Sequence, residues 1–124
     1  MIRLLIVDDQ LQTRRGLRMR LGLEPDLEIV GEAADGRSAL SMVNRLRPDV
    51  VIMDCEMPVM DGISAAAALR EAEDQVAVVM LTIHDDKQTR ERAREAGASA
   101  FVPKQCTDEP LIRAIRQAAK RDCS

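Results

Sequence analysis

Short runs of apolar residues alternate with amphipathic stretches along the whole chain. The apolar runs lie at residues 2–7, 50–54, 76–81 and 99–103, and residues 27–34 form a further predicted strand in which apolar and polar positions partly alternate. Continuous apolar runs of this length are typical of buried strands in a parallel sheet. The stretches between them have helical spacing, at 10–22, 37–47, 62–72, about 85–96 and 108–121. The pattern therefore predicts five strand–helix units.

Five such units in succession predict one α/β domain over residues 1–124, a doubly wound parallel sheet covered by helices on both faces. The length of 124 residues suits a single core, and no repeat or linker divides it. The helix at 85–96 differs from the others, because Ala93 is the only apolar residue between Lys87 and Glu95. We expect this helix to be weakly anchored and mobile.

The spacing also predicts which side chains point toward the core. In the first helix these are Leu11, Leu17 and Leu21. In the second strand, alternation predicts one shared face for Leu27, Ile29 and Gly31.

Composition narrows the class of protein. Aromatic residues make up 1% of the chain, so the core must be aliphatic, and Phe101 stands out as the single aromatic residue. A net charge of -3 with mixed signs does not favour nucleic-acid binding by this chain. We interpret the basic residues of the first helix as a solvated face rather than a phosphate-binding patch; these are Arg14, Arg15, Arg18 and Arg20.

Cysteine usage and the absence of long apolar runs indicate a cellular compartment. Cys55, Cys106 and Cys123 lack metal-ligand spacing and are interpreted as reduced thiols. The first strand follows Met1 without a signal peptide, and no apolar run approaches the length of a membrane span. We therefore expect a cytoplasmic protein that makes no contact with a membrane.

Polar residues follow four of the five predicted strands. They are Asp8 and Asp9, Asp54, Thr82, and Lys104. In an open α/β sheet, ligands bind outside the carboxyl ends of the strands. Each residue alone has an ordinary structural explanation, as a cap, a turn former or a solvated lysine. Their joint placement at corresponding strand ends favours a functional site.

Three carboxylates that lie close together repel one another and need a cation or a chemical role. Oxygen-only ligands suit Mg²⁺, whereas zinc would require His or Cys ligands that the chain does not supply as a set. A carboxylate beside Mg²⁺ can act as a nucleophile toward a phosphoryl group, assisted by a lysine and a hydroxyl. Asp54, Lys104 and Thr82 match these needs.

The segment at residues 54–62, DCEMPVMDG, resembles the phosphoacceptor signature D-x-x-M-P-x-M-D-G of response-regulator receiver domains. The polar residues at the other strand ends fall where that family has its acidic pair, switch hydroxyl and lysine. Stretches 31–36, 81–86 and 96–101 resemble the NarL/LuxR branch. One departure is Gln105, since many members have proline after the lysine.

The resemblance implies a (βα)5 sheet with strand order 2-1-3-4-5, as in flavodoxin and the chemotaxis receivers. A sensor histidine kinase would transfer a phosphoryl group to Asp54, and Lys104 would pair with a phosphoryl oxygen. Mg²⁺ would be held by Asp9, Asp54 and the main-chain carbonyl of Glu56, with Asp8 acting through a water molecule.

The same resemblance implies a switch. Thr82 would move toward the phosphoryl group and Phe101 would turn inward, changing the surface of the fourth helix, fifth strand and fifth helix. Glu56 and His84 would tune the lifetime of the phosphoryl group. The output would be transcription through a helix-turn-helix DNA-binding domain absent from this chain, with a homodimer formed on phosphorylation. Charged residues at 89–94 argue against a hydrophobic dimer interface there.

Other functions remain open at this stage. The leading interpretation is a switch that phosphorylates and dephosphorylates only itself, and so is not an enzyme with an external product. One rival is a phosphatase or phosphotransferase with an aspartyl nucleophile, which would turn over phosphomonoesters repeatedly. A flavodoxin-like cofactor binder would be coloured. A stand-alone receiver would act by protein contact, and a pseudo-receiver would show no Mg²⁺-dependent labelling.

Overall fold

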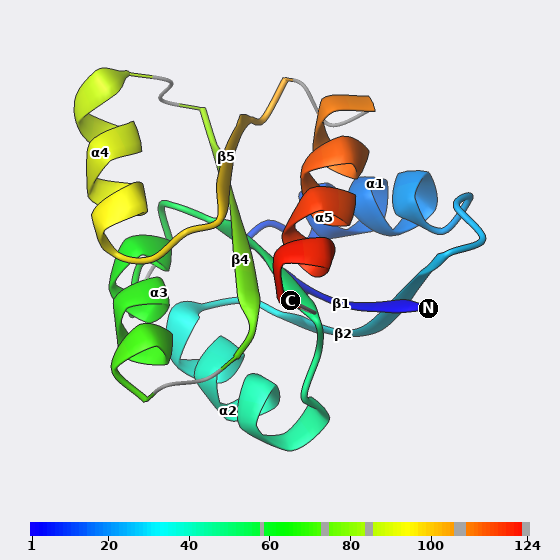
Figure 1. The fold of residues 1–124 in the computed structure, drawn as a ribbon, viewed down its shortest axis with the longest axis horizontal. Coiled ribbons are helices and arrows are strands. Elements are labelled where there is room, and N and C mark those ends of the chain that lie inside the picture. The colour runs from blue at the N-terminus through cyan, green and yellow to red at the C-terminus, as the bar shows by residue number, and fades with distance from the viewer. Residues whose placement is uncertain (58, 73–74, 84–85, 106–108, 123–124) are drawn as a thin grey trace.

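The computed structural model describes residues 1–124 except 58, 73–74, 84–85, 106–108 and 123–124. Within the described residues, strands and helices alternate along the chain (Figure 1). The strands are β1 (Ile2–Val7), β2 (Leu27–Ala33), β3 (Val50–Asp54), β4 (Ala77–Thr82) and β5 (Ala100–Pro103). The helices are α1 (Leu11–Leu21), α2 (Gly36–Leu46), α3 (Gly62–Glu71), α4 (Lys87–Glu95) and α5 (Glu109–Asp122).

The strands form one parallel sheet in the order β2-β1-β3-β4-β5. This confirms the predicted fold class and strand order. Every residue of β3 and β4 is buried, as their continuous apolar sequences predict. Because the strands are parallel, their carboxyl ends all meet at one edge of the sheet, where the polar residues of interest follow.

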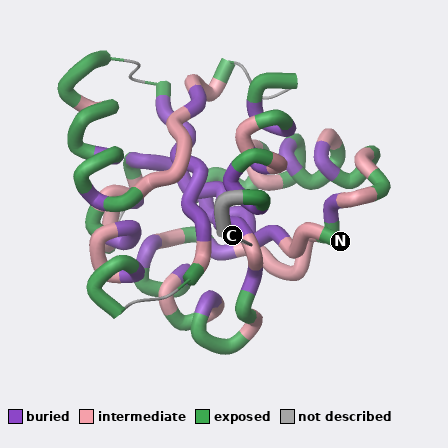
Figure 2. The backbone as a smooth tube through the Cα atoms, viewed as in Figure 1, coloured by how far each residue is buried: buried purple, intermediate pink, exposed green. Residues whose placement is uncertain are grey.

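In β1, β3, β4 and β5, successive residues point alternately into two separate cores. Ile52 packs in the core under α1 and α5, whereas its neighbour Met53 packs in the core under α2, α3 and α4. Figure 1 shows these helices on the two sides of the sheet, and Figure 2 shows the strands as the most buried part of the molecule. Both cores are almost wholly aliphatic, as the composition predicts.

The expected inward position of Leu11 is wrong. Leu17 and Leu21 are buried, but Leu11 is 49% exposed. A helix turns about 100° per residue, which carries Leu11 about 120° away from Leu17 around the helix axis. The buried face of α1 therefore passes through the residue positions near 14, 17 and 21 instead.

Gly31 also departs from the expected pattern. The β1–β2 register shifts between Leu4 and Leu5, so that Leu4 pairs with Ile29 and Leu5 pairs with Gly31. This irregularity reverses the alternation of β2. Gly31 lies against α2, because a Cβ there would meet the ends of Met42 and Leu46, whereas Leu27 and Ile29 pack in the opposite core.

The sparse anchoring expected for α4 is confirmed. Ala93 is its buried residue, and Figure 2 shows the helix as largely exposed. Its carboxyl end is held by Arg70 of α3, whose Nη1 donates a hydrogen bond of 2.6 Å to the carbonyl of Glu95. The mobility of α4 stays a prediction.

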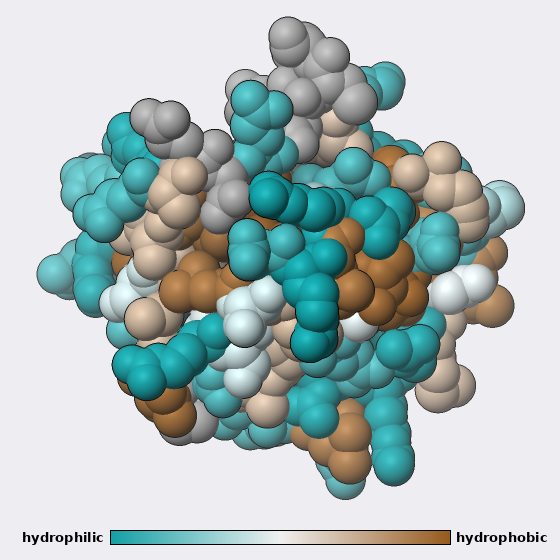
Figure 3. All heavy atoms as spheres, turned by 90° about the horizontal axis from the view of Figure 1, so that it is seen from below, coloured by the Kyte–Doolittle hydropathy of each residue, from teal (hydrophilic) through white to brown (hydrophobic). Residues whose placement is uncertain are grey.

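On the face shown in Figure 3, hydrophilic residues separate the hydrophobic areas from one another. Among the described residues, no helix combines the length and the apolar character that a membrane crossing requires.

The loop between β3 and α3 is folded tightly against the end of the sheet. The Gly62 amide donates to the carbonyl of Cys55 at 3.1 Å, and the Gly36 amide of α2 donates to the carbonyl of Met60 at 3.0 Å. A Cβ at Gly62 would collide with the carbonyl oxygen of Asp54. The loop therefore needs glycine at this position to reach its place beside Asp54.

Val59 in this loop has a backbone φ of +70° and a side chain that is largely exposed. A β-branched residue is strained in this left-handed conformation, which glycine adopts without cost. Val59→Gly should therefore raise the free energy of unfolding by about 0.5–1 kcal/mol, the relief of strain less the added entropy of the unfolded chain. Urea denaturation measures this change. A loss of stability would mean that Val59 makes contacts worth more than the strain.

Candidate functional site

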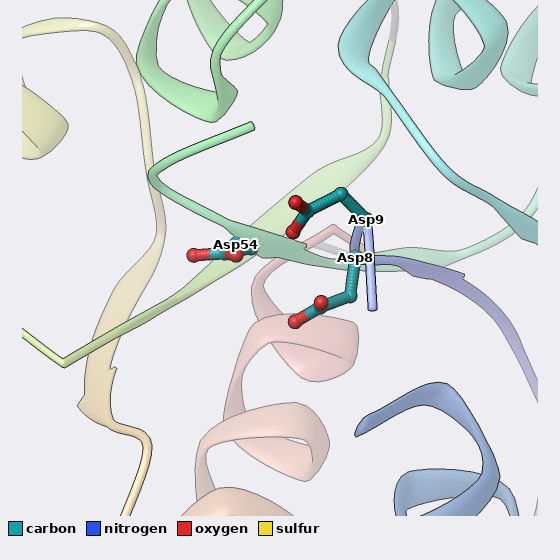
Figure 4. A group of neighbouring side chains, drawn as sticks. All are labelled: Asp8, Asp9 and Asp54. Atoms are coloured by element: carbon teal, nitrogen blue, oxygen red, sulfur yellow. The ribbon is translucent and has the colours of Figure 1, made fainter. Parts of the chain in front are cut away.

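Three carboxylates gather at the carboxyl edge of the sheet. Asp8 and Asp9 follow β1 and Asp54 ends β3, and each offers an oxygen atom within 4.8 Å of the others. Figure 4 shows the side chains of Asp8 and Asp9 lying on the side of β1 that faces Asp54. Asp8 and Asp54 are buried, whereas Asp9 is exposed to solvent.

Lys104 joins the two buried carboxylates. Its Nζ lies 2.9 Å from Oδ2 of Asp8 and 3.1 Å from Oδ2 of Asp54. Its backbone amide donates to the carbonyl of Thr82 at 2.7 Å, which anchors the residue where β4 and β5 end. Burial alone would lower the pKa of Lys104, but the two carboxylates outweigh burial and raise it. The Lys104 side chain is therefore charged. The peptide bond between Lys104 and Gln105, where many members of the family have proline, is trans.

The Asp54 carboxylate is held on both sides. Its Oδ1 accepts a hydrogen bond of 3.1 Å from the backbone amide of Glu56, and its Oδ2 accepts one from Lys104. Burial raises the pKa of Asp54, although both hydrogen bonds act in the opposite direction. Asp54 is thus a fixed carboxylate whose charge is poorly solvated.

The oxygen atoms of this cluster fit a small, hard cation. The donors are carboxylates alone, the set that Mg²⁺ prefers. Oδ1 of Asp8 accepts from the amide of Gln10 at 2.8 Å, but among the described residues its buried Oδ2 has no partner besides the Lys104 ammonium. Three carboxylates with one ammonium leave an excess of two negative charges, which a divalent ion would balance.

Thr82 and Phe101 lie on the neighbouring strands β4 and β5. Thr82 is fully buried at the end of β4, and Phe101 of β5 packs half-buried against the core under α3 and α4. The guanidinium carbon of Arg90 in α4 lies 5.4 Å from the centre of the Phe101 ring, within range of a cation–π interaction. His84 lies outside the described residues.

Cys55 is a buried core residue rather than a reactive thiol. Burial, with the neighbouring charges of Asp54 and Glu56, raises the pKa of its thiol to about 12, while a hydrogen bond with Thr82 opposes this shift. A thiol with so high a pKa is a weak nucleophile at neutral pH. Cys106 and Cys123 lie outside the described residues.

Sequence reasoning missed Arg14 and Glu32. The solvated position expected for Arg14 is wrong, because its side chain is only 16% exposed. Arg14 Nη1 donates to the carbonyl of Asp8 at 2.7 Å, and its Nε donates to Glu32 of β2 at 3.1 Å. Its spacing from Leu17 and Leu21, which places it on the buried face of α1, is the signal that could have revealed it.

Comparison with known proteins agrees with this geometry. Residues 4–116 match the family model for the response regulator receiver domain. The transcriptional regulatory protein DegU of Brevibacillus brevis is 34% identical over 119 residues, which cover 96% of this chain and 50% of DegU. The nitrate/nitrite response regulator protein NarP of Escherichia coli is 39% identical over 116 residues, covering 94% of this chain and 54% of NarP.

One of the relatives carries the name of an enzyme, a protein-glutamate methylesterase/protein-glutamine glutaminase of Nocardioides. It is 40% identical over 118 residues, which cover 94% of this chain and 32% of the relative. The chain thus spans about half or less of each of these three relatives.

Among solved structures, the signal receiver domain of the putative response regulator NarL from Mycobacterium tuberculosis superposes with a TM-score of 0.92 at 34% identity. The superposition covers 96% of each chain. The family model matches nearly the whole chain, and both the strand order and the acidic cluster are accounted for by the same assignment. The chain belongs to the response regulator receiver domain family.

Proposed function

We propose that this receiver domain is a phosphorylation-dependent switch in which Asp54 accepts a phosphoryl group from a sensor histidine kinase. The observation that carries the proposal is the buried Asp54 carboxylate, paired with Lys104 at 3.1 Å beside two further carboxylates. A structural carboxylate needs no such neighbours. A phosphoacceptor needs a poorly solvated, oriented oxygen with cationic charge at hand.

In the proposed transfer, an Asp54 carboxylate oxygen attacks the phosphorus of a phosphohistidine. The new phosphorus–oxygen bond forms as the phosphorus–nitrogen bond breaks, and the bonding pair returns to the imidazole. The Glu56 amide holds one carboxylate oxygen, and Lys104 offers positive charge to the oxygens of the arriving group.

Asp9, Asp54 and the main-chain carbonyl of Glu56 would hold Mg²⁺ directly, and Asp8 would act through a water molecule. The ion supplies positive charge that offsets the negative charge of the phosphoryl oxygens. Support comes from the all-oxygen donor set and from the excess negative charge of the cluster.

The proposed readout runs through Thr82 and Phe101. Thr82 would shift to bond a phosphoryl oxygen, and the half-buried Phe101 ring would turn further inward. Because Arg90 lies over that ring and α4 buries little apolar surface, this rearrangement would shift the population of the surface formed by α4, β5 and α5. Glu56, together with His84, would tune the lifetime of the phosphoryl group.

We further propose that residues 1–124 act as one regulatory domain whose output is transcription. DegU and NarP are regulators, and each extends well beyond the match. DNA would be bound only by another domain, with homodimer formation on phosphorylation. The methylesterase relative supports a second candidate, control of an enzymatic domain. Under either output, this chain acts on no external substrate of its own.

Incubation with acetyl phosphate and Mg²⁺ should add one phosphoryl group to the protein, measured by intact mass. Asp54→Asn should add none, because the nucleophile is missing. EDTA should suppress the addition to the wild-type protein, because it removes the Mg²⁺ ion. Asp61→Asn is the matched control, since Asp61 caps α3 through the Ser64 amide and should leave labelling intact.

In the same assay, Glu56→Ala should change the rate at which the label is lost. Labelling of Asp54→Asn at the wild-type level would refute the assignment of the phosphoacceptor, and multiple turnovers of phosphomonoesters would instead support a phosphatase.

Asp54→Asn should also raise the melting temperature in EDTA at pH 7.5, because the variant carries no charge that must be kept in a buried site. The folded-state pKa of Asp54 is raised above its ordinary value of 3.8, so its ionised form destabilises the fold. The loss of folding free energy caused by the ionised Asp54 carboxylate is complete above its pKa in the folded protein. This loss disappears as the pH falls toward 3.8. Melting curves from pH 7.5 to pH 4 should show the advantage of the variant shrinking, and a constant advantage would contradict this.

The single phenylalanine provides a direct probe of the switch. Biosynthetic labelling with 4-fluorophenylalanine marks Phe101 alone. Addition of beryllofluoride and Mg²⁺ should shift its ¹⁹F resonance, because the ring leaves its half-exposed site. Thr82→Ala should bind beryllofluoride yet give a smaller shift. An unchanged Phe101 resonance in protein saturated with beryllofluoride and Mg²⁺ would remove Phe101 from the mechanism.

A further inference from the structure

Arg14 links α1 to the backbone of the acidic cluster. Its Nη1 donates a hydrogen bond of 2.7 Å to the carbonyl oxygen of Asp8, and its Nε donates to Oε1 of Glu32 at 3.1 Å. Arg18, one turn further along α1, donates to Oε2 of Glu32 at 2.7 Å. The Glu32 carboxylate thus accepts one hydrogen bond from each arginine, and this arrangement orients the guanidinium of Arg14.

The Asp8 carbonyl needs a partner from outside the sheet. The Asp8 amide makes the last hydrogen bond between β1 and β2, to the carbonyl of Ala33 at 3.0 Å. Because β2 ends at Ala33, no further strand amide follows to bond the Asp8 carbonyl. Arg14 provides the missing donor and so determines the direction of this carbonyl.

That direction matters for Asp9. The Asp8 carbonyl and the Asp9 amide belong to one planar peptide unit, so fixing the carbonyl fixes the plane from which Asp9 departs. Among the described residues, the Asp9 carboxylate has neither a hydrogen bond nor an ion pair, unlike those of Asp8 and Asp54. With no such partner in this part of the chain, the place of the Asp9 carboxylate beside the cluster in Figure 4 depends on the backbone that carries it.

We propose that Arg14 is a positioning residue for divalent-cation binding, acting through the Asp8–Asp9 peptide on the Asp9 carboxylate. This inference rests on the proposed function, because it assumes that the cluster binds Mg²⁺. Glu32 orients Arg14, and the chain Glu32–Arg14–Asp8 connects β2 and α1 to the site. Residues that hydrogen-bond to metal-binding groups without touching the metal typically change the metal affinity by about 10–100-fold.

The sign of the effect separates positioning from electrostatics. Removing a cation near a cation site should tighten Mg²⁺ binding if charge alone mattered. Removing the hydrogen bond that aims Asp9 should weaken binding. Positioning and electrostatics thus predict opposite changes for the loss of Arg14.

The experiment is calorimetric titration of the unphosphorylated protein with Mg²⁺. Arg14→Met keeps the apolar stem but removes the charge and the donors, and should raise the Mg²⁺ Kd roughly tenfold. Arg15→Met is the matched control, because Arg15 is exposed and lies next in the chain. It loses the same charge and should bind Mg²⁺ as tightly as the wild type or slightly more tightly.

Melting in EDTA checks that each variant folds. Should Arg14→Met fail to fold, Arg14→Lys carries the same test, since it keeps the charge but cannot serve Glu32 and Asp8 with one planar fork. Unchanged or tighter binding in a folded Arg14 variant would overturn the positioning role while leaving the proposed function intact. Failure of the wild-type protein to bind Mg²⁺ would instead overturn the proposed function.

Discussion

The paired attraction of one buried ammonium for two buried carboxylates is the interaction on which this site depends. Lys104 lies 2.9 Å from Asp8 and 3.1 Å from Asp54, and both acids are buried. Removing such groups from water is costly, and their mutual attraction offsets that cost only when the geometry is well defined. The ends of β1, β3 and β5 are therefore tied together by charge where no further strand pairing is available.

The backbone around this triad explains how its geometry is kept. The Glu56 amide holds Asp54 from the side opposite Lys104, and glycine at position 62 lets the loop lie against the end of β3. The Lys104 amide is bonded to Thr82, so the lysine and the proposed switch residue share one anchor. Lys104 thus connects Asp54 directly to the ends of β4 and β5, next to the sparsely anchored α4.

Much of this arrangement is predictable from the sequence, because parallel strands buried on both faces give continuous apolar runs. The runs at 50–54 and 76–81 identify β3 and β4 almost to the residue. The convergence of Asp8, Asp54, Thr82 and Lys104 follows from their places at strand ends. The strand order came from the family resemblance rather than from the periodicity, which does not specify which strands are neighbours.

The remaining features depend on contacts between residues distant in sequence. The register shift that turns Gly31 toward α2 has no local signature, and neither does the positive φ of Val59. The bond from Arg14 to the Asp8 carbonyl arises because β2 ends at Ala33, a fact about strand length in the folded sheet. Helical spacing places Arg14 on the buried face of α1, but only the structure reveals its partners.

In this proposal Asp8, Asp54 and Lys104, together with Asp9, form one site for a divalent ion and for a phosphoryl group on Asp54. A crystal structure of the protein with Mg²⁺ and beryllofluoride, which imitates a bound phosphoryl group, tests it most directly. We expect beryllium to be bonded to an Asp54 oxygen, Mg²⁺ to be bound by Asp9 and Asp54, and Lys104 and Thr82 to contact the fluorides. Crystals that leave Asp54 unmodified, with its pairing to Lys104 undisturbed at saturating reagent, would contradict it.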